Sequence, residues 1–108
     1  MMLMNEHFLN QIALRTVESW FLSMGFQPSG GWDEHDVTCR RQYGPHILWT
    51  VCARVPDDID EDAAALSFSH YISEHNKLPS SVKFQPYGLQ FYDCPCGCGS
   101  FVYATIYQ

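Results

Sequence analysis

The stretch Ile47-Leu-Trp-Thr-Val-Cys-Ala-Arg-Val55 alternates strictly between two kinds of position. Every odd-numbered residue is apolar, and the even-numbered positions hold Leu48, Thr50, Cys52 and Arg54. Side chains of a β-strand point alternately to its two faces, so this pattern predicts a strand with one face on a core. The opposite face of the strand carries Cys52 and Arg54.

The preceding segment, residues 37–43, is predicted to pair with this strand in a hairpin around Gly44-Pro45-His46. That register places Cys39 on the core face and Cys52 on the opposite face, because a shift of one residue would mix the faces. The two cysteines are therefore not expected to share a metal or a disulfide. Residues 27–36, rich in glycine, proline and serine, are expected to be a loop.

A second hairpin is predicted to join residues 82–93 to residues 100–107, with the last residue of the first segment opposite the first residue of the second. The alternation changes phase where Pro86 and Gly88 interrupt the first segment, so a bulge or an edge position is expected there. The core face then consists of Leu89, Phe91, Val102, Ala104 and Ile106, and the outer face of Gln90, Tyr92, Phe101, Tyr103 and Thr105.

A first helix is predicted over residues 5–24, with Asn5 as its N-cap and Gly25 after its end. Apolar residues recur there at i, i+3, i+4 and i+7, which is typical of a helix with one buried face. Phe8 and Leu22 fall outside this stripe. They are expected to contact the chain's own loops or, as the alternative, to form a second contact surface for a partner or for another copy in a homodimer.

The acidic run 57–62 opens a second helix that ends near His75 or Asn76. Carboxylates are favourable at a helix N-terminus, and Asp57 or Asp58 is expected to cap its free amides. The element order is then α-β-β-α-β-β. We predict a single α+β domain over residues 1–108, in which a four-stranded antiparallel sheet has two helices packed on one face.

Length, charge and hydrophobic content exclude several classes of protein. The 108 residues carry a formal charge of −6 and are 46% hydrophobic, so a core is expected and an acidic disordered tail is excluded. The negative charge argues against a protein held mainly on duplex DNA or on an anionic membrane. The sequence has no export signal, no apolar run of membrane-spanning length, and an odd number of cysteines, five. These features favour a cytoplasmic location with reduced thiols.

Residues Cys94-Pro-Cys-Gly-Cys98 place three thiols within one short segment that glycine and proline allow to turn tightly. Thiolates suit tetrahedral zinc, so one structural zinc held by Cys94, Cys96 and Cys98 is a hypothesis. Zinc sites usually pair cysteines with about two to four residues between them, and only Cys94 and Cys98 have such a gap. Two alternatives stay open: reduced cysteines without metal, and a redox-active or inter-chain disulfide.

A cluster of carboxylates occupies the start of the second helix: Asp57, Asp58, Asp60, Glu61 and Asp62. One interpretation is a solvated helix start that serves the fold alone. The other is a negative surface offered to a basic partner. Such a surface can mimic nucleic acid, because its charges match those that a DNA- or RNA-binding groove expects.

The outer face of the predicted sheet combines aromatic residues with arginines. Exposed rings beside guanidinium groups can stack unpaired bases or anchor a protein interface. Ordinary cross-strand packing of the rings is the alternative without a functional role. The residues concerned are Arg40, Arg54, Tyr92, Phe101 and Tyr103.

The catalytic motifs that a sequence can reveal are absent: G-x-S-x-G, H-E-x-x-H, a phosphate-binding glycine loop and the zinc deaminase signature. We therefore expect a small non-catalytic protein, an inhibitor or adaptor that engages a basic, nucleic-acid-binding protein surface. Small acidic domains are frequent among inhibitors made by phages and other mobile elements, which is an analogy of composition alone. The alternative is a zinc-supported module that binds single-stranded nucleic acid through the outer sheet face, although the charge makes nucleic acid the less favoured partner.

Overall fold

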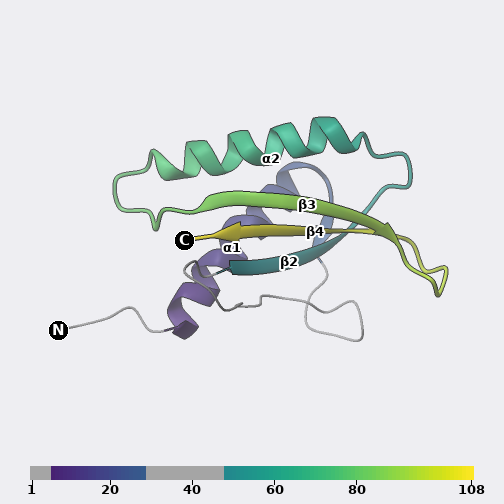
Figure 1. The fold of residues 1–108 in the computed structure, drawn as a ribbon, viewed down its shortest axis with the longest axis horizontal. Coiled ribbons are helices and arrows are strands. Elements are labelled where there is room, and N and C mark those ends of the chain that lie inside the picture. Colours follow the sequence, from purple (N-terminus) through teal and green to yellow (C-terminus); the bar gives the residue numbers. More distant parts are fainter. Residues whose placement is uncertain (1–5, 29–47) are drawn as a thin grey trace.

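The computed structural model describes residues 6–28 and 48–108, which form two helices and four strands (Figure 1). The α+β class, with two helices and a four-stranded antiparallel sheet, is as predicted, although the first strand of the sheet is β1 (Gln27–Pro28) and not the segment 37–43. Four predicted features lie outside the described residues: the strand over 37–43, Cys39, Arg40 and the Asn5 cap. In chain order the elements are α1 (Glu6–Ser23), β1 (Gln27–Pro28), β2 (Leu48–Val55), α2 (Glu61–Asn76), β3 (Gln85–Asp93) and β4 (Ser100–Tyr107).

The strands form one antiparallel sheet in the order β1-β2-β4-β3. β2 pairs with β4 along its whole length, and Val55 at the end of β2 lies opposite Ser100 at the start of β4. β3 and β4 form the predicted hairpin, in which Asp93 also lies opposite Ser100. The register of β3 shifts between Pro86 and Gly88, which confirms the expected irregularity and places it in an edge strand.

The structure corrects the expectation that Gln27 and Pro28 belong to a loop. They form the short strand β1, with Gln27 opposite Arg54 and Pro28 opposite Ala53. Proline has no N–H to offer a second neighbour, so it is tolerated at the edge of a sheet, which is where β1 lies. After α1 the chain reverses direction, and β1 runs antiparallel beside β2.

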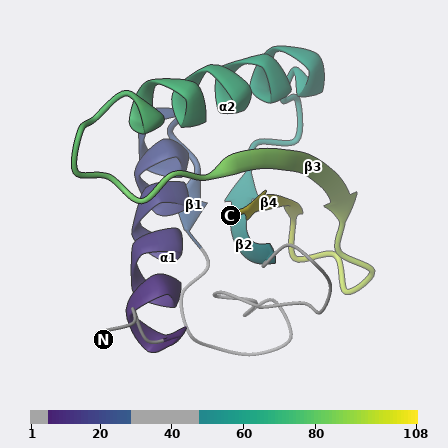
Figure 2. The same ribbon diagram turned by 60° about the vertical axis from the view of Figure 1, so that its left-hand side comes forward.

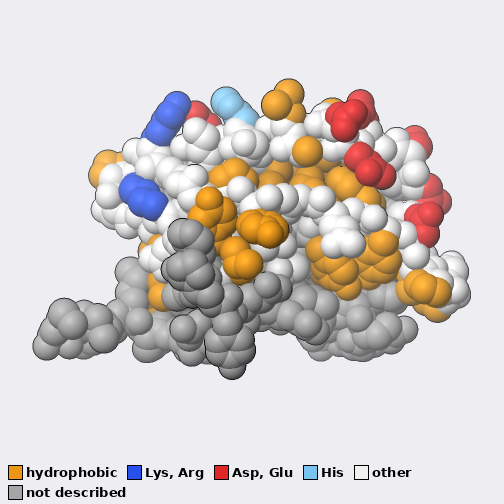
Figure 3. All heavy atoms as spheres, in the orientation of Figure 1, with side chains coloured by type: hydrophobic (Ala, Val, Ile, Leu, Met, Phe, Trp, Pro, Cys, Tyr) orange, Lys and Arg blue, Asp and Glu red, His pale blue; other side chains and the backbone are white. Residues whose placement is uncertain are grey.

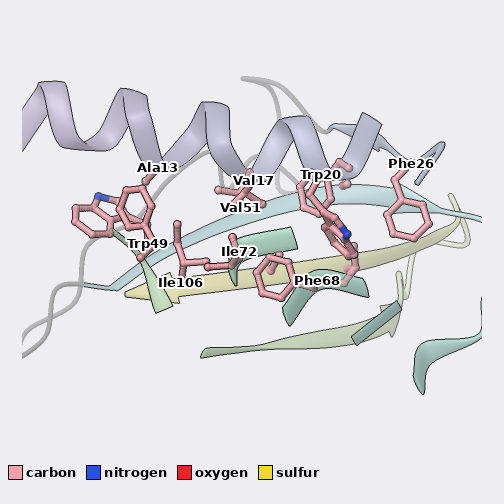
Figure 4. Close-up of a cluster of buried hydrophobic side chains, with 14 of the residues drawn as sticks. Ala13, Val17, Trp20, Phe26, Trp49, Val51, Phe68, Ile72 and Ile106 are labelled. Atoms are coloured by element: carbon pink, nitrogen blue, oxygen red, sulfur yellow. The ribbon is translucent and has the colours of Figure 1, made fainter. Parts of the chain in front are cut away.

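Both helices pack on one face of the sheet, as predicted, and the core fills the space between (Figure 2). Figure 4 shows side chains from α1, α2, β2 and β4 meeting there. The alternation that predicted β2 is confirmed, since Trp49, Val51, Ala53 and Val55 are buried in this core. The large side chains that are fully buried in it are Trp20, Phe21, Trp49, Phe68 and Phe84.

A tight turn after α1 explains why the chain reverses so sharply. Gly25 has a φ of +77°, a left-handed conformation that glycine adopts without steric cost. The amide of Phe26 donates to the carbonyl of Phe21 at 2.9 Å, and the amide of Gly25 donates to that of Leu22 at 3.1 Å. These two bonds satisfy carbonyls that the end of the helix leaves free. The turn therefore aims Gln27 along β2.

The cap of α2 differs from the prediction. Asp60, rather than Asp57 or Asp58, is the N-cap residue, and its Oδ1 accepts a hydrogen bond from the Ala63 amide at 3.1 Å. Because the helix begins at Glu61, Asp57 and Asp58 lie too far before its first turn to cap it.

Asp60→Ala is expected to lower the free energy of unfolding by about 0.5–2 kcal/mol, because the Ala63 amide loses its acceptor. Asp58→Ala is the matched control: it removes the same charge nearby but no cap, and a change within about 0.5 kcal/mol is expected. Urea unfolding of both variants measures the difference. Equal losses would show that charge at the helix start matters and the cap does not.

Candidate metal centre

The loop between β3 and β4, residues 94–99, extends past the end of the sheet (Figure 1) and is called the Cys loop below. The amide of Cys94 donates to the carbonyl of Gly99 at 2.9 Å, and the amide of Gly97 donates to the carbonyl of Cys94 at 2.9 Å. Gly97 has a φ of +82° and Gly99 a φ of +143°, conformations that favour glycine. The two glycines thus let a closed loop form within six residues.

Three thiols meet in the Cys loop. The Sγ atoms of Cys94, Cys96 and Cys98 all lie within 4.8 Å of one another, and those of Cys94 and Cys96 are 2.9 Å apart. Cys96 is exposed, while the other two are half-buried. The cluster could hold a metal ion, since thiolates are strong ligands for soft and borderline cations.

Crowding of the thiols lowers the acidity of Cys98. The hydrogen bond with Cys96, followed by burial and by the hydrogen bond with Cys94, raises the pKa of Cys98 to about 12. The Cys98 thiol therefore keeps its proton when no cation is near. A metal ion reverses this preference, because coordination deprotonates a thiol.

The acidic residues at the start of α2 lie at the same end of the molecule as the Cys loop. Asp57, Asp58, Asp60, Glu61 and Asp62 are all exposed and are called the acidic end below. A polar hollow of about 120 Å³ lies between the acidic end and the two residues that flank the Cys loop, and Asp57, Glu61, Asp93 and Ser100 are among its lining residues. The hydroxyl of Ser100 lies 2.9 Å from Oδ1 of Asp57 and 2.6 Å from Oδ1 of Asp93.

Charge is unevenly distributed over the molecule. In the view of Figure 3 most of the carboxylates gather over the start of α2 and the neighbouring end of the sheet, and the basic side chains in view lie toward the opposite end. Arg54 is an exception, since its guanidinium lies beside Gly99 of the Cys loop. Within residues 6–28 and 48–108 the one ion pair joins Lys77 to Glu74 at 2.6 Å, next to the far end of α2. The acidic end therefore forms no ion pair with the described part of the chain.

The aromatic residues of the outer face stack on one another. The rings of Tyr92 and Tyr103 lie 5.1 Å apart and nearly parallel at 19°, and their hydroxyls are 3.3 Å apart. Burial and this hydrogen bond raise the pKa of Tyr92. Tyr92 also stacks on Phe101 at 5.6 Å, and the guanidinium of Arg54 lies 5.4 Å from the centre of the Phe101 ring.

The burial of Phe101 corrects a prediction. Phe101 was expected as an exposed ring of the outer face, but it is only 1% exposed. Tyr92 and Arg54 both contact its ring, so the cross-strand packing that sequence analysis held as an alternative describes this residue. Phe101 has no open face on which a base could stack.

Phe8 and Leu22 are 46% and 66% exposed, so they lie off the buried stripe of α1 as expected. Their predicted role in a homodimer stays a prediction. No sequence motif pointed to Asp93 and Ser100, which link the acidic end to the base of the Cys loop. The one available signal was their position on either side of that loop.

No helix in the described ranges is long and apolar enough to cross a membrane. No protein-family model, curated protein or solved structure matches the chain.

Proposed function

We propose that this chain is a non-catalytic binding protein, an inhibitor or adaptor that engages a basic surface of another protein through its acidic end. The observation that carries the proposal is the group of five exposed carboxylates without an ion-pair partner among the described residues. Basic surfaces are typical of proteins that bind nucleic acid. The acidic end would imitate the negative charge of that nucleic acid.

The fold accounts for only part of the acidic end. Asp60 caps α2, Asp57 accepts from Ser100, and carboxylates in the first turn favour the helix dipole. Among described residues, by contrast, Asp58 and Asp62 make no side-chain hydrogen bond or ion pair. Carboxylates this close together repel one another, and a basic partner relieves that repulsion. The excess charge therefore supports a binding role.

We further propose that the ion suited to the Cys loop is zinc, held by Cys94, Cys96 and Cys98. Zinc would fix the shape of a loop that borders the acidic end. The alternative function, the reading of single-stranded nucleic acid by the outer face, has less support because Phe101 is buried and Tyr92 and Tyr103 stack on each other.

The acidic end is tested with two variants of equal net charge. Asp58→Asn with Asp62→Asn removes two charges from the acidic end, and Glu18→Gln with Glu74→Gln removes two charges elsewhere. We expect the first variant to bind polylysine more weakly than the second at low salt, by roughly twofold to fivefold per carboxylate. Fluorescence anisotropy of a labelled polylysine measures both. Equal weakening would mean that total charge, rather than the acidic end, determines binding.

A further inference from the structure

A turn holds Cys94 and Cys96 beside each other at the start of the Cys loop. The amide of Gly97 donates to the carbonyl of Cys94 at 2.9 Å, which closes a turn over residues 94–97 with Pro95 at its second position. Proline favours that position because its φ is already fixed. The Sγ atoms of the two cysteines lie 2.9 Å apart. The local backbone thus favours contact between these two sulfurs.

The sulfurs of Cys94 and Cys96 are close enough to be joined by a covalent bond after a small movement. A disulfide places its sulfurs about 2.05 Å apart, so the two Sγ atoms need to approach by less than about 1 Å. Cys96 is exposed, so a reagent in solution can reach it. Only Pro95 separates the two cysteines, and a ring this small is strained, which makes its disulfide easy to reduce again.

We infer that Cys94 and Cys96 are a redox pair, which a low-molecular-weight disulfide of the glutathione type oxidises reversibly to an intramolecular disulfide. The thiolate of Cys96 attacks one sulfur of the small disulfide and displaces one thiol, which leaves a mixed disulfide on Cys96. The Sγ atom of Cys94 then attacks that of Cys96 and displaces the second thiol. The loop loses two electrons and two protons, and the small disulfide gains them as it becomes two thiols.

The redox pair goes beyond the proposed function and does not need zinc. A metal ion and the disulfide would use the same two sulfurs, so each excludes the other. Oxidation would then release an ion from the Cys loop, next to the acidic end. The test uses the metal-free chain, so that failure to form the disulfide and failure to bind zinc are separate results.

Differential labelling of the thiols locates the bond. The reduced, metal-free full chain is treated with glutathione disulfide and quenched with acid. Remaining thiols are alkylated with a first reagent, and thiols released by later reduction with a second. Residues 84–108 contain neither Lys nor Arg, so trypsin leaves the three cysteines of the Cys loop in one peptide. We expect the second label on Cys94 and Cys96 and the first on Cys98. Excess reduced glutathione, added before the quench, should return the first label to all three.

Two variants separate the redox pair from the third thiol. Cys98→Ser keeps the pair, so we expect it to form the disulfide as the unsubstituted chain does. Cys94→Ser in addition removes one member, and roughly tenfold more chain should then retain glutathione on Cys96, because the intramolecular attack that displaces it is lost. Equal retention in the two variants would overturn the inference. So would a second label on Cys98, Cys39 or Cys52, or a bond that excess reduced glutathione leaves intact.

Discussion

Replacement of Trp20 by alanine is expected to lower the free energy of unfolding by about 3–5 kcal/mol, because it removes one of the largest fully buried side chains of the core. Trp20 is fully buried on α1, and its ring lies 4.9 Å from that of Phe68 on α2 and 5.6 Å from that of Phe26. Its Nε1 also donates to the Ser67 hydroxyl at 3.1 Å. One side chain thus joins α1 to α2 and to the turn that leads into β1.

Urea unfolding followed by circular dichroism measures this loss. Leu22→Ala on the same helix is the matched control; its side chain is 66% exposed, so a change within about 0.5 kcal/mol is expected. Ser67→Ala separates the hydrogen bond from the ring, and we expect about 1 kcal/mol from that bond. A loss below about 1 kcal/mol for Trp20→Ala would contradict the placement of this ring at the centre of the core.

The elements of this fold that the sequence predicts are those with a clear period. Eight alternating residues of β2, the apolar stripe of α1 and the hairpin of β3 and β4 could each be recognised from local pattern alone. The strand β1 could not, because two residues carry no period. The N-cap of α2 was also predicted at the wrong residue, because five acidic residues in six positions offer several possible caps. Only the position at which the helix begins identifies Asp60 as the cap.

The candidate site divides in the same way. The thiol cluster was predictable because its three cysteines lie within five residues, so no long-range contact is needed to bring them together. The burial of Phe101 was not, since its ring is contacted by Arg54 and Tyr92 from two other strands. Strand alternation assigns a residue to a face but does not say what covers that face.

Sheet topology explains why the acidic end and the Cys loop are neighbours. The pairing of Val55 with Ser100 ends β2 beside the base of the Cys loop, and the chain then runs through Asp57 into α2. The Ser100 hydroxyl lies within hydrogen-bond distance of Asp57, which follows β2, and of Asp93, which ends β3. A metal in the Cys loop would therefore lie next to the proposed docking surface.

Serine in place of both Cys94 and Cys98 is expected to abolish zinc binding, from one ion per chain to none, since a single thiolate does not form a zinc site. Metal analysis of the reduced, desalted chain measures the stoichiometry. Cys52→Ser removes a buried cysteine outside the cluster and should leave one zinc bound. Zinc retained by the double variant, or absent from the unsubstituted chain, contradicts the assignment.

Zinc is expected to stabilise the fold less than its affinity suggests. An ion that binds only the folded chain at 100 times its dissociation constant adds about 2.7 kcal/mol, which for a domain of this size raises the melting temperature by roughly 10 °C. All three ligands of the Cys loop lie within five residues, so the unfolded chain also binds the ion and the gain falls. We expect a rise of a few degrees at most, measured by thermal unfolding with and without zinc. A rise of about 10 °C or more would mean that a ligand distant in sequence completes the site only in the folded chain.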